Sequence, residues 1–119
     1  MLSIGELARN SGVAPSAVRF YEQQGLVASA RTAGNQRRFH QAEECVIRII
    51  RVAQRVGLTV AEIRELMAEL PADREAVSVA DFLRVRRNLE AEAQRRITRL
   101  VGVLDDLESE RKLCAVPVG

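Results

Sequence analysis

One uninterrupted segment constrains the fold of this chain more than any other feature of its sequence. Between Val79 and about Leu113 there is no proline, and the only glycine is Gly102. The Ser-Val-Ala-Asp sequence at residues 78–81 resembles a helix capping box with aspartate in its last position. The segment therefore predicts one helix of about 35 residues, roughly 50 Å long, which exceeds the diameter of the small domain that precedes it.

The apolar residues of this predicted helix form a stripe that is too long to be buried within a single chain. In the second half they recur at alternating steps of four and three, the spacing of a coiled-coil seam. The step from Leu89 to Ala93 is an additional four, a stutter that locally unwinds a supercoil. The stripe consists of Phe82, Val85, Leu89, Ala93, Ile97, Leu100, Leu104 and Leu107. We expect it to pair two copies of the chain as a homodimer; the alternative is a helix folded back on its own domain.

The first 25 residues predict two short helices joined by a tight turn. Ser-Ile-Gly-Glu at residues 3–6 has the form of a capping box, and Gly12 suits the left-handed end of the helix that follows. Pro15 opens a second helix, which stops at Gly25. Two such helices make a helix-turn-helix.

A β-hairpin and two further helices are expected next. Gly34 and Asn35 both tolerate positive φ, so they suit the tip of a two-stranded hairpin. Apolar residues at helical spacing predict a third helix over residues 41–56, and a Thr-Val-Ala-Glu capping box opens a fourth over residues 60–70.

The fold class that follows is mainly α: a winged helix-turn-helix with a small β-hairpin wing, followed by a long dimerisation helix. We expect a DNA-binding domain at residues 1–70, a linker loop at 71–77, the dimerisation helix at 78–114 and a short tail at 115–119.

Positive charge is concentrated in the first half of the chain. Residues 1–58 hold eight arginines and four glutamates, whereas the whole chain carries a net charge of only +2. An uneven but ordinary solvated surface is one interpretation. The other is a module that binds a polyanion such as nucleic acid.

A winged helix-turn-helix can place its second helix in the major groove of DNA. On that helix Ser16, Arg19 and Tyr21 are the candidate outward residues, while Ala14, Val18 and Leu26 are expected to pack inward. On the wing, Arg37 and Arg38 are expected to meet phosphates or a narrowed minor groove. Strand alternation places these two arginines on opposite faces.

The sequence resembles the MerR family of bacterial transcription regulators. The resemblance is carried by "IGELARNSGVAPSAVRFYEQQGLV…NQRRF" and by "AQRVGLTVAEIRELM", and it continues through the long helix. Within that family, "GNQRRF", "AQRVGL" and "RRITRLV" are most similar to the SoxR branch.

The resemblance implies a homodimer paired through antiparallel long helices. It also implies binding to double-stranded promoter DNA at a two-fold site with an unusually long spacer. Such regulators bend and untwist the spacer, and so act on RNA polymerase indirectly. The implied DNA contacts are Ser16, Arg19 and Tyr21 on the reading helix, and Arg31, Asn35, Gln36, Arg37 and Arg38 on the wing.

The cysteines depart from the SoxR pattern. An iron–sulfur centre needs four thiolates, but this sequence holds only Cys45 and Cys114. With Ser78 at the opening of the long helix and one thiol in the tail, we expect no metal site and no cofactor. Cys114 lies near Arg111 and Lys112, so it is a redox-sensor candidate; the alternative is a small apolar side chain at a helix end. Cys45 shares a helical face with Ile49, so we expect it to be buried.

Enzyme activity is not expected, because with His40 as the only histidine no acid–base or nucleophilic set assembles. No apolar run approaches the roughly 20 residues that span a bilayer, and no secretion signal is visible, so we expect a cytoplasmic protein without a membrane partner. Two other functions remain open. They are an architectural DNA-bending factor without a promoter role, and a coiled-coil module that binds another protein.

Overall fold

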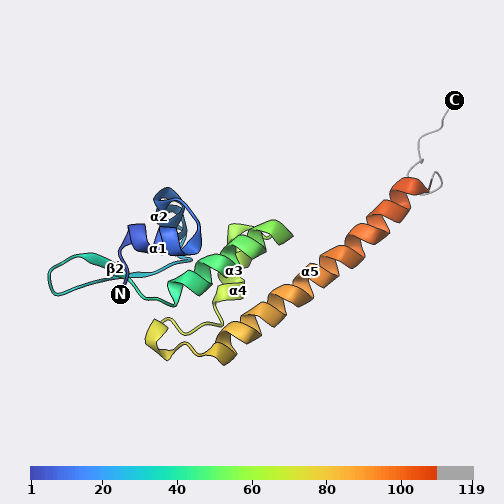
Figure 1. Cartoon of the computed structure of the whole chain (residues 1–119). Helices are drawn as coiled ribbons and strands as arrows, with labels where there is room; N and C mark the ends of the chain where they lie inside the picture. Colours follow the sequence, from blue (N-terminus) through green and yellow to red (C-terminus); the bar gives the residue numbers. More distant parts are fainter. Residues whose placement is uncertain (110–119) are drawn as a thin grey trace.

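The computed structural model describes residues 1–109, and it confirms the predicted order of elements. A bundle of short helices carries a small hairpin at one end, and one long helix leaves the bundle and extends far beyond it (Figure 1). The elements are α1 (Ile4–Ser11), α2 (Pro15–Gln23), β1 (Ser29–Arg31), β2 (Arg37–Phe39), α3 (Glu43–Val56), α4 (Val60–Met67), the 3-10 helix η1 (Arg74–Ala76) and α5 (Val79–Glu108).

Local capping signals set the starts of the helices. Three predicted capping boxes are confirmed, each with the side-chain oxygen of the first residue accepting from the backbone N–H three residues later and the acidic side chain accepting from the first residue's N–H. The pairs are Ser3–Glu6 at α1, Thr59–Glu62 at α4 and Ser78–Asp81 at α5. Glycines in the left-handed conformation end α1 and α3, with φ of 69° at Gly12 and 98° at Gly57.

The core is centred on α1, which packs against α2, β2 and α3. Four side chains of α3, namely Val46, Ile47, Ile50 and Ala53, are fully buried, and α1 packs against both α2 and α3. Val18 and Leu26 are buried as expected, but Ala14 is exposed because it lies outside the first turn of α2 as its N-cap.

The hairpin is short and is anchored at its base. The strands β1 and β2 are antiparallel, with Ser29 opposite Phe39 and Arg31 opposite Arg37. Leu2 pairs with the other edge of Phe39, whose side chain is fully buried. Asn35 has a φ of 60° at the tip of the hairpin, in agreement with the predicted turn. The base of the wing is thereby part of the core, while its tip is exposed.

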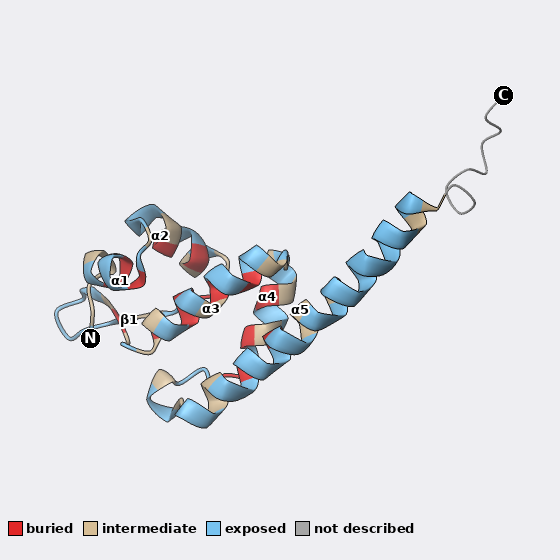
Figure 2. Cartoon of the chain, turned by 45° about the vertical axis from the view of Figure 1, so that its right-hand side comes forward, coloured by how far each residue is buried: buried red, intermediate tan, exposed pale blue. Residues whose placement is uncertain are grey.

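The apolar stripe of α5 divides into two parts, and this corrects the single dimer seam that we expected. Val85 and Leu89 are buried against the chain's own α3 and α4, so they belong to the core of the helical bundle. Phe82 and Ala93 are partly buried. The distal half of the helix is exposed (Figure 2). Its stripe residues Ile97, Leu100, Leu104 and Leu107 are between 54% and 65% exposed.

The ends of two helices also differ from expectation. α5 ends at Glu108, where Ser109 takes an extended conformation, and residues 110–113 of the predicted helix lie outside the described residues. α4 ends at Met67, before Leu70. None of the described helices combines the length and the apolar character needed to cross a membrane.

Candidate nucleic-acid interface

The outward face of α2 presents a compact set of exposed side chains. Ser16, Arg19, Phe20 and Gln23 are all exposed, and their spacing of three, four and seven residues places them on one side of the helix. Phe20 is 42% exposed, which is unusual for an aromatic side chain of a small domain. Arg19 forms no ion pair with any described residue. This face offers a hydroxyl, an uncompensated guanidinium and an aromatic ring to a ligand.

Tyr21 does not belong to this face, contrary to our expectation. Its side chain is only 6% exposed, and its hydroxyl donates to Gln54 Oε1 of α3 at 3.3 Å. Tyr21 follows Val18 by three residues, so the two share the inward face of α2. The same spacing places Phe20 outward, four residues after Ser16. Helical periodicity alone would therefore have been enough to predict Phe20, and not Tyr21, as the outward residue of the site.

Contacts from α4 and α3 hold α2 in place. Arg64 of α4 donates two hydrogen bonds, of 3.1 and 2.9 Å, to the carbonyl oxygen of Gln24 at the C-terminal end of α2. Gly25 follows with a φ of 74°, and Leu26 N–H donates back to Tyr21 O at 2.9 Å. The role of Arg64 was not predictable from local sequence, because its partner lies 40 residues away.

The wing is tied to α2 through Glu22. Arg37 Nη1 lies 3.1 Å from Glu22 Oε1, and the hydroxyl of Ser29 donates to the other carboxylate oxygen of Glu22. These contacts place β1 and β2 beside the C-terminal half of α2. Arg37 is half exposed in this pair, at 47%, so its charge is partly compensated within the chain.

The remaining wing residues organise the turn and include an exposed Arg31 and a partly buried Arg38. Arg38 Nη2 donates to Gln36 Oε1 at 2.7 Å, and Arg31 Nη1 donates to the carbonyl oxygen of Asn35 at 3.1 Å. Neither arginine forms an ion pair with a described residue. The wing therefore presents two positively charged side chains that hydrogen bonds pre-orient.

Other arginines of the basic half have structural partners. Arg51 Nη1 donates to the carbonyl oxygen of Gly12 at 3.3 Å, at the turn between α1 and α2. Arg48 lies near Glu44, which also accepts from Asn10 Nδ2 at 2.7 Å. The excess of positive charge in residues 1–58 thus overstates the charge that is available to a polyanion.

A buried ion pair joins the start of α3 to η1, and sequence reasoning missed it. Glu43 is fully buried, and its Oε1 lies 2.6 Å from Arg74 Nε. Burial raises the pKa of Glu43, and Arg74 opposes that rise. Beside this pair, His40 Nε2 lies 3.0 Å from Glu75 Oε1. Glu43 precedes the buried residues Val46 and Ile47 by three and four positions, which was the available signal that it faces inward.

Cys45 is exposed, and this corrects the expectation of a buried thiol. It lines an apolar groove of about 610 Å³ between α3 and α5, beside Ile49, Val52, Val79, Phe82, Leu83 and Leu89, with Arg48 and Arg86. The redox candidate Cys114 and its neighbours Arg111 and Lys112 lie outside the described residues. Within residues 1–109, no three His, Cys, Asp or Glu side chains gather closely enough to hold a metal ion.

Family models match most of this chain. Residues 2–70 match the MerR helix-turn-helix family of regulatory proteins, and residues 46–109 match the MerR DNA-binding model. The chain is 37% identical over 108 residues to a SoxR homolog from Chromobacterium violaceum described as an HTH-type transcriptional activator, with 91% of this chain and 72% of that protein covered. It is also 37% identical over 100 residues to the regulator HmrR of Sinorhizobium medicae, covering 83% of this chain and 67% of that protein.

Solved structures share the fold. The lead(II) complex of PbrR691 from Ralstonia metallidurans aligns with a TM-score of 0.54 at 26% identity, covering 100% of this chain and 92% of that one. A MerR family regulator from Listeria monocytogenes aligns with a TM-score of 0.59 at 25% identity, covering 91% and 81%. HiNmlR bound to promoter DNA has a TM-score of 0.56 at 19% identity over 90% of this chain and 84% of that one, which indicates a common fold.

Proposed function

This chain belongs to the MerR family of helix-turn-helix transcriptional regulators, and from that premise we propose that it binds a two-fold promoter site as a homodimer and distorts the spacer DNA. One observation carries the proposal. The exposed face of α2, with Ser16, Arg19 and Phe20, lies beside a wing whose Arg31 and Arg38 form no ion pair with a described residue. A protruding helix flanked by positively charged side chains fits a major groove and its adjoining phosphates.

The side chains divide into base-reading and backbone-binding groups. Arg19 is long enough to reach guanine or a phosphate from α2, and Phe20 can contact the methyl group of thymine. Arg38, Arg31 and the polar wing residues Asn35 and Gln36 suit contacts to phosphate and sugar oxygens. Arg37 can bind DNA only if it weakens or breaks its ion pair with Glu22. Its contribution to DNA affinity should therefore be smaller than that of Arg38.

The distal half of α5 supplies the dimer interface in this proposal. Its exposed stripe from Ile97 to Leu107 is too apolar to remain in water along an isolated helix, and a second copy of the same helix is the simplest cover. Two reading helices related by a two-fold axis would then bind two half-sites. Bending and untwisting the DNA between them would act on RNA polymerase indirectly. A protein with this function would work in the cytoplasm, where the bacterial chromosome lies.

The group that senses the inducing signal is a separate proposal from DNA binding. The four thiolates of an iron–sulfur centre do not fit a sequence with two cysteines, of which Cys45 lies alone on α3. We therefore assign no step to such a centre. Cys114 stays the candidate sensor thiol, and the test is a Cys114→Ser variant in a transcription assay with and without peroxide. Unchanged oxidant dependence would reject the assignment.

Selection of binding sites from a random pool of DNA duplexes tests the function directly. Wild-type protein should enrich sites with two-fold symmetry and bind them well above the non-specific level in moderate salt. The variant Arg19→Ala should weaken the selected site by about 1–3 kcal/mol. Transcription in vitro from a promoter that carries the selected site distinguishes a regulator from an architectural factor, which would bend the DNA without changing transcript yield. Enrichment of no common sequence would contradict the proposal.

A further inference from the structure

Arg96 is the point at which α5 leaves the DNA-binding domain. Its charged side chain is only 20% exposed, although the helix becomes exposed to solvent immediately beyond it. From Ile97 to Asp105 every residue of α5 is exposed. The buried residues Val85 and Leu89 lie on the domain side of Arg96. The guanidinium of Arg96 therefore sits at the boundary between the packed and the projecting halves of the helix.

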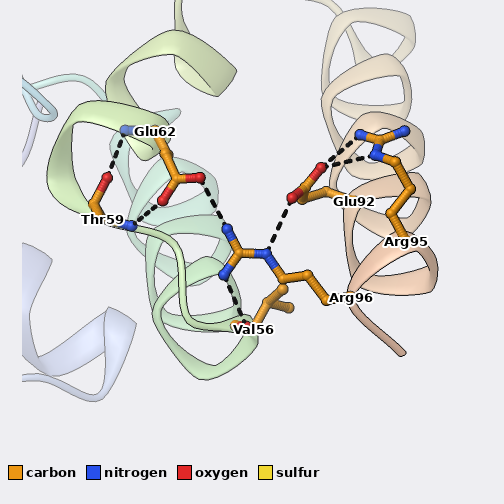
Figure 3. A network of polar contacts seen from close by, with 6 residues as sticks. All are labelled: Val56, Thr59, Glu62, Glu92, Arg95 and Arg96. Atoms are coloured by element: carbon orange, nitrogen blue, oxygen red, sulfur yellow. Dashed lines mark hydrogen bonds and ion pairs between the residues drawn. The ribbon is translucent and has the colours of Figure 1, made fainter. Parts of the chain in front are cut away.

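The guanidinium of Arg96 contacts the ends of two other helices (Figure 3). Its Nη2 lies 2.9 Å from Glu62 Oε2 in the first turn of α4, and its Nη1 lies 3.5 Å from the carbonyl oxygen of Val56 in the last turn of α3. Its Nε donates to Glu92 Oε1 of α5 itself at 3.0 Å, which orients the side chain toward the domain. One side chain thus joins α5 to the α3–α4 joint.

The joint is shaped to admit this side chain. Glu62 uses its Oε1 to accept from Thr59 N–H at 2.8 Å, and that hydrogen bond holds the pKa of Glu62 below its ordinary value. Glu62 Oε2 remains for Arg96. Between the helices, Gly57 has a φ of 98°, and a Cβ added there would lie 3.2 Å from Arg96 Nη1. Glycine at this position provides both the turn and the space for the guanidinium.

A continuous set of contacts leads from this joint to the reading helix. Arg64 of α4 donates to the carbonyl oxygen of Gln24, the C-cap of α2, and Gln54 of α3 accepts from the hydroxyl of Tyr21. A rotation of α5 relative to the joint would break the contacts of Arg96 with Glu62 and Val56 before it disturbed α2. The twelve helical residues beyond Arg96 act as an arm of about 18 Å, so a small change of angle becomes a large displacement at its end.

We propose that Arg96 is a positioning residue that sets the angle between α5 and the DNA-binding domain, and thereby how far the homodimer distorts the spacer DNA. The inference rests on the proposed function, because the angle matters to DNA only if the distal halves of α5 pair two copies. Arg96 does not touch DNA in this scheme. It determines where the two reading helices stand relative to each other.

The neighbouring arginine provides a matched control. Arg95 donates to the same Glu92, at 2.9 and 2.6 Å, but it is exposed and has no contact with α3 or α4 in the described structure. Arg95→Met and Arg96→Met remove the same charge from adjacent positions. Glu62→Gln is a second variant, because glutamine also completes a capping box while it loses the ion pair with Arg96.

The experiment measures energy transfer between dyes at the two ends of a promoter duplex, together with transcript yield and binding affinity. Arg96→Met and Glu62→Gln should each reduce the change in energy transfer and lower transcription by about threefold to tenfold. Affinity for the duplex should stay within roughly twofold, because neither residue contacts DNA. Arg95→Met should behave as wild type, and the double variant should lose no more than either single variant because the two changes remove one interaction.

A DNA-free measurement separates this inference from the proposed function. Small-angle scattering of the dimer should show a broader distance distribution for Arg96→Met than for Arg95→Met. Identical scattering, energy transfer and transcription for the two variants would overturn the role of Arg96. Wild-type protein that binds duplexes without changing the energy transfer would instead overturn the proposed distortion of DNA.

Discussion

The arginines of this chain differ in function because they differ in what surrounds them. Arg64 and Arg51 donate to backbone carbonyl groups at the ends of helices, whereas Arg19 and Arg38 form no ion pair with a described residue. Their side chains are chemically identical, so only the partners that the fold brings within 4 Å distinguish a structural arginine from one that we propose to bind DNA. Two predictions concern individual residues.

Arg38→Ala should weaken binding to all DNA sequences alike, because a phosphate contact carries no sequence information. The slope of log K against log salt should become shallower by about one. Arg37→Ala should act in the same direction but less strongly, since Glu22 compensates part of its charge. Fluorescence anisotropy titrations at several salt concentrations measure both effects, with Arg95→Ala as the control for charge. A change in base preference without a change in the salt slope would contradict the phosphate assignment.

Arg74→Met should lower the free energy of unfolding by about 3 kcal/mol near neutral pH, because it leaves the buried Glu43 carboxylate without its partner. Burial already raises the pKa of Glu43, so the folded chain binds the proton more tightly than the unfolded chain does. The contribution of this carboxyl group to stability therefore falls as the pH rises from the ordinary glutamate range through the raised pKa. Removing Arg74 raises the pKa further, so the loss should be larger at pH 7 than at pH 5.

Urea unfolding at the two pH values measures this difference. Arg84→Met is the control, since Arg84 pairs with Asp81 on an exposed surface and should cost less than about 1 kcal/mol. The double variant Arg74→Met/Glu43→Leu should recover much of the loss, because it buries no unpaired charge. An equal cost for Arg74→Met and Arg84→Met would show that the Glu43–Arg74 pair does not stabilise the fold.

Among the elements, α2 shows how one helix serves the core and the ligand at once. Tyr21 and Val18 face the core, while Arg19 and Phe20 face outward. The C-terminal end of α2 is fixed by Arg64, and its flank is fixed to the wing by Glu22. The reading surface is therefore held by three neighbouring elements.

Tyr21→Phe tests which face of α2 the tyrosine serves. The change removes only the hydrogen bond to Gln54, so it should lower the free energy of unfolding by about 1 kcal/mol and leave DNA affinity unchanged below the melting temperature. Phe20→Ala should do the reverse, with weaker binding and little loss of stability. Thermal melts and binding titrations on the two variants give the comparison. A loss of affinity in Tyr21→Phe at full stability would restore Tyr21 to the interface.

At the scale of the whole molecule, the long helix has two functions along its length. Its first part completes the core of the DNA-binding domain, and its second part projects with an exposed apolar stripe. The alternative of a helix folded back on its own domain thus applies to residues near Val85 and Leu89. Pairing of two copies is proposed for the part beyond Arg96.

Leu104→Glu should convert the protein to a monomer at micromolar concentration, because it places a charge in the middle of the proposed apolar interface. DNA binding should weaken at the same time, since a monomer reads one half-site. Sedimentation velocity measures the mass, and Gln94→Glu serves as the control because it adds a negative charge to α5 outside the stripe. A Leu104→Glu variant that sediments like wild type would place the interface elsewhere.

Local signals in the sequence were sufficient for the secondary structure and the fold class. A capping box depends on residues three apart, a left-handed turn on a single glycine, and a helical face on spacings of three and four. These interactions are complete within one or two turns of chain. The same local periodicity favours Phe20 over Tyr21 as the outward residue.

The tertiary structure alone decided the partners of charged and half-buried side chains. Arg74 finds Glu43 across 31 residues, and Arg96 finds Glu62 across 34. Cys45 is exposed because the groove beside it stays open between α3 and α5. Charge and hydropathy state what a side chain can bind, but the distance to its partner depends on how helices far apart in the chain pack. For that reason the sequence determined the helices and the hairpin, while packing determined which arginines have partners within the chain and where α5 leaves the domain.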